Sequence, residues 1–161
     1  MHSDNHHSRT GRWSVYLAGE IHSDWRERVA EGVRTHALPV DLTGPVTDHA
    51  LSDDAGAMIL GAEKDPFWHD RKGAGLNAIR TRTLLGRADI VVVRFAGEYR
   101  EWNAAFDAGQ AVAMGTPLIV VHDDTLRHAL KEVDASAMAV AQTPEQVVEI
   151  LRYVTEGALK R

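Results

Sequence analysis

Short, almost continuously apolar segments alternate with longer segments of helical character, and this alternation limits the folds open to the chain. The clearest apolar segments are DIVVVRF at 89–95 and PLIVVH at 117–122. Strands without polar alternation are typical of parallel sheets, because helices cover both faces of such a sheet. The pattern predicts strands at 13–18, 38–42, 89–95, 117–122 and 137–141, and helices at 23–37, 74–88, 103–114, about 125–132 and from 143 onward.

This order of elements predicts an α/β fold with a single three-layer α/β/α domain. Its five-stranded parallel sheet is expected to be flavodoxin- or Rossmann-like, with strand order 2-1-3-4-5. The 161 residues suffice for one domain, expected over 13–161, after a polar, histidine-rich segment 1–12 that we interpret as a disordered leader. The segment 44–72 reads as irregular, with one short helix near 54–62, and is a candidate lid over the sheet edge.

Composition excludes several classes of function. The chain has no cysteine, which removes disulfides, thiolate catalysis and zinc–thiolate sites and fits a cytoplasmic location. Its formal charge of −5 argues against nucleic acid as a partner, and no apolar run approaches the ~18 residues of a membrane span. There is neither a G-x-G-x-x-G fingerprint nor a Walker A lysine, so no cofactor is expected. The histidines and acids of 44–72 lack a recognised ligand spacing, so no metal is expected either.

Asp107 is the acid that stands out, because it interrupts a stretch of small and apolar residues, WNAAFDAGQAVAMG at 102–115. Ligands of parallel sheets bind beyond the carboxyl ends of the strands, and Asp107 follows the third strand by about one helical turn. A helix N-terminus stabilises an anion by roughly 0.3–1 kcal/mol, so Asp107 is expected to be ionised. Asn103 can share its helix face. The alternative is a helix-start acid that backbone amides satisfy.

Glu101 is the second candidate acid, in the loop before that helix. Two carboxyl groups in one pocket can divide their roles, one charged and one that transfers protons, as glycosidic-bond cleavage requires. The alternative is that Glu98, Arg100 and Glu101 form a solvated charged loop.

Two further segments supply candidate binding residues. In YLAGEIHSDWR, at 16–26, Gly19 leaves room for a ligand, and Glu20 and His22 follow it on the same loop. His22 either transfers protons near neutral pH or caps the next helix. In the helix at 74–88, one or two of three polar residues are expected to reach the site; these are Asn77, Arg80 and Thr81.

Four blocks of sequence resemble the YtoQ family: VYLAGEIHSDWR, GPVTDHALSDD, NAIRT and EWNAAFDAGQAVAMGTPLIVV. The resemblance extends from about residue 13 to the C-terminus. That family is grouped with the nucleoside 2-deoxyribosyltransferase-like proteins, which include nucleoside monophosphate N-glycosidases. The resemblance implies that Asp107 matches the glutamate nucleophile of the transferases. It also implies that Glu101 matches an acid six residues earlier and that Tyr16 matches a tyrosine of the first strand.

The resemblance implies a nucleoside N-glycosidase or 2-deoxyribosyltransferase with a small nucleoside-like substrate. The carboxylate attacks the anomeric carbon, the base leaves, and water or a second base takes the sugar. The resemblance also implies a homo-oligomer, at least a dimer, in which a neighbouring chain completes the site.

The chain departs from the family pattern at three positions. The nucleophile is aspartate rather than glutamate, which changes its reach by about an ångström. An acid of the preceding helix falls on Thr81, and Gly19-Glu20 replaces a Gly-Ser phosphate turn. A neutral nucleoside or another sugar conjugate is therefore expected rather than a 5′-phosphate. The alternative function is a protein that binds a nucleotide-like metabolite without turnover.

Overall fold

The computed structural model describes residues 11–98, 100–157 and 159. Within these residues five parallel strands form one sheet in the order β2-β1-β3-β4-β5, which confirms the predicted order. Valine and isoleucine dominate the central strands, as expected for strands covered on both faces. The strands are β1 (Trp13–Gly19), β2 (Val40–Thr43), β3 (Ile90–Arg94), β4 (Leu118–Val121) and β5 (Ala139–Ala141).

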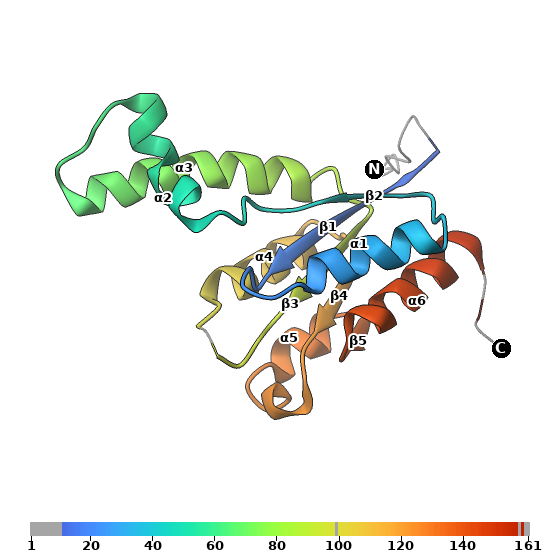
Figure 1. Ribbon diagram of the computed structural model, residues 1–161. Helices are drawn as coiled ribbons and strands as arrows, with labels where there is room; N and C mark the ends of the chain where they lie inside the picture. The colour runs from blue at the N-terminus through green and yellow to red at the C-terminus, as the bar shows by residue number, and fades with distance from the viewer. Residues whose placement is uncertain (1–10, 99, 158, 160–161) are drawn as a thin grey trace, which may run out of the picture.

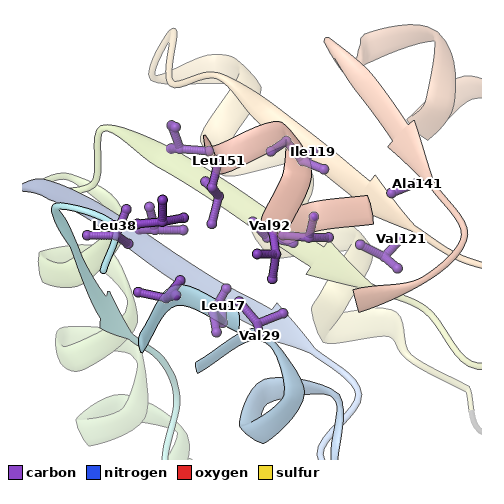
Figure 2. Packing of buried hydrophobic residues seen from close by; sticks show 14 of the residues in the cluster. Leu17, Val29, Leu38, Val92, Ile119, Val121, Ala141 and Leu151 are labelled. Carbon is purple, nitrogen blue, oxygen red and sulfur yellow. The ribbon is translucent and has the colours of Figure 1, made fainter. Parts of the chain in front are cut away.

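Helices cover both faces of the sheet (Figure 1). Side chains of α1 (Trp25–Thr35) and α6 (Pro144–Glu156) bury one face, and Figure 2 shows several of them interleaved with strand residues. The other face packs against α4 (Trp102–Ala113) and against residues beside α5 (Lys131–Ser136). Because side chains alternate along a strand, Val15 and Leu17 point to the first face and Tyr16 to the second.

Local signals fix the ends of several elements. The predicted start of α6 is confirmed: the Thr143 side chain accepts a hydrogen bond from the Gln146 amide, and Pro144 occupies the first helical turn. The helix expected near 125–132 divides into a short 3-10 helix, η1 (Asp124–Leu126), and α5. Residues 1–10 of the expected leader lie outside the described residues. Arg12 donates to an Asp41 carboxylate oxygen at 2.7 Å, which connects the residues just before β1 to β2.

The segment 44–72 differs most from expectation, because it is largely helical. It contains α2 (His49–Leu60) and the first residues of α3 (Pro66–Leu85). Both helices begin at an aspartate cap: Asp48 accepts from the Leu51 amide at 2.9 Å, and Asp65 from the Phe67 amide at 2.9 Å. These caps stabilise two helices that the hydrophobic pattern of the segment did not predict.

The helices α2 and α3 form a hairpin that extends away from the sheet, here called the arm (Figure 1). The two helices pack closely where glycines face each other. A Cβ atom on Gly56 would lie 2.4 Å from the backbone nitrogen of Gly73, so this crossing tolerates no side chain. The C-terminal end of α3 returns to the domain, where Leu85 is fully buried against the sheet.

Candidate functional site

Unsatisfied buried polar atoms gather at the carboxyl ends of β1, β2 and β3. Within the described residues, the buried side-chain atoms without a hydrogen-bond partner are Tyr16 Oη, Thr43 Oγ1, Arg94 Nε and Glu101 Oε1. An unpaired buried polar group costs roughly 1–3 kcal/mol, so such groups are rare unless a ligand satisfies them. This edge includes the boundary between β1 and β3, where the chain connections diverge to opposite faces and ligands of such sheets bind.

Asp107 lies on the flank of α4, beside the alanines that face the sheet. Ala104 and Ala108 are buried, whereas Asp107 is half-buried. Among the described residues, no hydrogen bond or ion pair engages its carboxyl group. Burial raises its pKa to about 6, so the group is largely ionised at neutral pH but not stabilised by a helix cap. Burial rather than the helix N-terminus therefore controls its ionisation.

The Tyr16 hydroxyl lies among the groups around Asp107. Burial raises the pKa of the Tyr16 phenol; Thr81 beside it opposes this shift, and Asp107 adds to it. Arg26 and Arg80 also lower this pKa through their charges. The structure thus brings together predicted residues from three elements: Tyr16 of β1, Thr81 and Arg80 of α3, and Asp107 of α4.

Glu101 belongs to a different cluster. Its Oε2 accepts a hydrogen bond from the Ala96 amide at 2.8 Å. Burial raises the pKa of Glu101, and the charge of Glu20 adds to the rise, while Arg94 lowers it. Glu101 is the N-cap residue of α4, and Asp107 lies six residues along the chain within that helix, a spacing that does not place two residues on one helix face. The two acids therefore occupy neighbouring clusters, one around Tyr16 and one around Arg94.

Glu20 organises the loop after β1. Its buried carboxylate accepts hydrogen bonds from the backbone amides of His22 and Ser23, the latter at 2.7 Å. Burial acts to raise the pKa of Glu20, but these hydrogen bonds and the charge of Arg94 hold it below the ordinary value. Because the Glu20 carboxylate oxygens accept hydrogen bonds from the loop's own amides, Glu20 fixes the loop conformation.

The remaining predicted residues lie around these clusters. Gly19 adopts a φ of 95°, and a Cβ atom there would lie 2.1 Å from the Arg94 carbonyl oxygen, so β3 fills the space that was expected to hold a ligand. Asn77 donates to the Ser52 hydroxyl at 2.8 Å and so joins the two helices of the arm. His22 and Asn103 are exposed near this edge.

Sequence reasoning missed Thr43 and Arg94. Thr43 is the register partner of Tyr16 across β1 and β2, so both side chains lie on the same face of the sheet. Arg94 ends the apolar run of β3, and a charged residue in that position is the signal that could have identified it.

Two cavities lie toward the β5 side of the sheet. One of about 420 Å³ lies between β5 and α6, and one of about 480 Å³ lies beside His122 and Asp134. Neither is lined by Asp107 or Glu101. No cluster of three metal-ligating side chains occurs within the described part of the chain. In that same part, no helix has the length and hydrophobicity to cross a membrane.

Sequence comparison connects the chain to known proteins. Residues 16–155 match the family model described as nucleoside 2-deoxyribosyltransferase YtoQ. A protein of Bacillus subtilis (strain 168), described as uncharacterized protein YtoQ, is 39% identical over 142 residues, which cover 88% of this chain and 96% of that protein.

Solved structures show the same fold at low sequence identity. A conserved protein from Enterococcus faecalis V583 superposes with a TM-score of 0.59 and 16% identity, over 89% of this chain and 99% of the other. A 2-deoxyribosyltransferase from Bacillus psychrosaccharolyticus superposes with a TM-score of 0.51 and 14% identity, over 84% of this chain and 90% of the other.

Proposed function

Because the chain belongs to the nucleoside 2-deoxyribosyltransferase YtoQ family, we propose that it cleaves the N-glycosidic bond of a nucleoside-like substrate with Asp107 as the nucleophile. The observation that carries this proposal is the half-buried Asp107 carboxyl group, which makes no hydrogen bond or ion pair with the described residues. It lies beside Tyr16 at the edge of the sheet where unsatisfied polar atoms gather.

The Asp107 cluster supports the sugar half of the reaction. An Asp107 oxygen attacks the anomeric carbon, the bond from that carbon to the base breaks, and the bonding electrons leave with the base. Water or a second base then displaces Asp107 from the same carbon, which completes hydrolysis or transfer. The hydroxyl groups of Tyr16, Thr43 and Thr81 supply hydrogen-bond partners for Asp107 and for the sugar, with Arg80 at the rim.

The cluster around Glu101 and Arg94 is proposed to contact the base of the substrate. The raised pKa of Glu101, which results first from burial, suits a carboxyl group that gives a proton to the departing base. His22 and Asn103, both exposed near this edge, are proposed as substrate contacts. Gly19 and Glu20 contribute by fixing the loop that borders the site.

We propose a homo-oligomer because the arm exposes large apolar side chains far from its own site. Five large apolar side chains at the arm tip are each more than half exposed: Met58, Ile59, Leu60, Phe67 and Trp68. With a rise of 1.5 Å per residue, Phe67 lies roughly 20 Å along α3 from Thr81. The tip therefore cannot close over its own Asp107 while α3 remains one helix, contrary to the expected lid. A second copy is the proposed partner, and the exposed Trp102 and Phe106 of α4 offer it an apolar surface.

The absence of cysteine supports the further proposal that the protein works in the cytoplasm. The alternative function is a binding protein without turnover, which the aspartate at 107 and the threonine at 81 favour. It predicts a nucleoside that raises the melting temperature and is recovered unchanged.

Incubation with a panel of 2′-deoxy- and ribonucleosides, followed by chromatography of the free base, tests the proposed reaction. We expect base release by the wild-type protein and none by Asp107→Ala. A control substitution of an exposed acid outside the site and the arm, Glu132→Ala in α5, should leave the rate unchanged. Equal release by wild type and Asp107→Ala would refute the proposed nucleophile.

A further inference from the structure

Arg94 has an unusual position for a cation. It is the last residue of β3, at the boundary with β1, and its side chain is 23% exposed. Its Nε is buried without a hydrogen-bond partner among the described residues and lies 3.6 Å from a Glu20 carboxylate oxygen. The guanidinium group therefore has donors that the described protein atoms leave unused.

The surroundings of Arg94 disfavour an anionic ligand. Three carboxyl groups, those of Glu20, Glu101 and Asp123, lie close enough to interact electrostatically with its charge. Each of the three accepts a hydrogen bond from an amide or a hydroxyl group instead of forming a two-pronged pair with the guanidinium. A phosphate or carboxylate that bound Arg94 would lie among these acids, so the ligand that fits is neutral.

A guanidinium group carries only donors, arranged in a plane, and it pairs best with two adjacent acceptors in that plane. Among neutral nucleobases, the 6-oxopurines present such a pair in O6 and N7, whereas adenine presents a donor beside N7. Cytosine also has two adjacent acceptors, but one of them, O2, lies next to the glycosidic nitrogen, on the side that the sugar occupies. Glu101 Oε1, buried and without a partner in the described structure, complements the remaining edge, because N1–H of a 6-oxopurine is a donor beside O6.

We propose that Arg94, together with Glu101, selects a 6-oxopurine as the base of the substrate. This inference rests on the proposed function and adds the class of base to it. In this arrangement Arg94 covers N7 and Glu101 accepts N1–H, so for a 6-oxopurine the hydrogen bonds from Arg94 stabilise the negative charge of the departing base in place of a proton from Glu101.

Binding of free bases tests this assignment without turnover. Isothermal titration calorimetry of the wild-type protein should show hypoxanthine binding about tenfold or more tightly than adenine, with cytosine weaker than hypoxanthine. Arg94→Lys keeps the charge beside Glu20 but loses the planar donor pair, so it should bind hypoxanthine and adenine with similar affinity. Arg100→Gln, an exposed change in the loop after β3, should retain the wild-type preference. Circular dichroism and thermal melts verify that each variant is folded.

The outcomes separate this inference from the proposed reaction. Adenine binding as tightly as hypoxanthine, or a preference that survives Arg94→Lys, would overturn the role of Arg94 even if the protein releases bases from nucleosides. A hypoxanthine preference that Arg94→Lys abolishes would support that role even if no base were released. Absence of binding by every base would overturn it as well.

Discussion

Tyr16 and Asp107 come from different elements, β1 and α4, yet their side chains interact electrostatically at the carboxyl edge of the sheet. Burial is the main cause of the raised pKa of the Tyr16 phenol, and the Asp107 carboxyl group adds to it. The buried Tyr16 hydroxyl has no hydrogen bond of regular geometry among the described residues, although Thr81 lies beside it. The pair thus forms a polar centre that a ligand can satisfy, and the proposed chemistry depends on it.

The pH dependence of base release should reflect the ionisation of Asp107. Burial raises the pKa of this carboxyl group to about 6, and only the ionised form is a nucleophile. We expect kcat/KM to fall about tenfold per pH unit below about pH 6, measured by base release in buffers of constant ionic strength. Unchanged kcat/KM down to about pH 4 would contradict this assignment.

Removal of the Asp107 charge should stabilise the fold at neutral pH. The unfolded chain ionises this group near its ordinary pKa of 3.8, whereas the folded protein retains the proton up to about pH 6. The free energy of unfolding therefore falls as pH rises from 3.8 to about 6, and this loss is absent below pH 3.8. Because the group is partly exposed, Asp107→Asn should gain only on the order of 1 kcal/mol at pH 8. Urea denaturation at pH 8 and pH 3.5 measures the gain, and an equal gain at both would disagree with this explanation.

The arm should depend on its glycine contact. A Cβ atom on Gly73 would lie 2.8 Å from the Asp53 carbonyl oxygen, so Gly73→Ala should separate the helices and destabilise the protein by about 1–3 kcal/mol. Gly75, also in α3, has no atom within 4 Å of such a Cβ, so Gly75→Ala should stabilise α3 by roughly 0.5–1 kcal/mol. Thermal melts should show a lower melting temperature for Gly73→Ala and a higher one for Gly75→Ala. Equal changes in melting temperature would argue against the close crossing of the two helices.

The arm tip should control self-association. Trp68→Glu places a charge on the exposed apolar tip and should shift the protein toward the monomer in light scattering coupled to size-exclusion chromatography. Met138→Glu, an equally drastic change at a residue 77% exposed near β5, is the matched control and should leave the mass unchanged. A wild-type monomer, or dissociation by the control alone, would refute the proposed interface.

The sheet was predictable because its residues carry a simple pattern. The valine runs of β3 and β4 are buried on both faces, and the spacing between them leaves room for one covering helix. The arm was not predictable from the same pattern. In α3 only Gly73 and Leu85 are buried, so apolar residues show no single helix face, and the caps at Asp48 and Asp65 were its main local signals.

The site was predictable only in part, for a similar reason. Asp107 stands out because its neighbours are small, and Tyr16 was identified through the family resemblance. The separation of Glu101 from Asp107 follows from α4, which begins directly after Glu101, because two residues six apart do not share one face of a helix. Arg94 and Thr43 were missed because each ends a strand as a single polar residue, and their unsatisfied atoms are visible only in three dimensions.

The most direct test of the central claim is mass spectrometry of the protein quenched during turnover of a nucleoside that it cleaves. If Asp107 is the nucleophile, peptide mapping will find a sugar residue attached to the peptide that contains Asp107, and Asp107→Asn will show neither adduct nor base release. Base release by Asp107→Asn at the wild-type rate, or an adduct on another residue, would contradict the account.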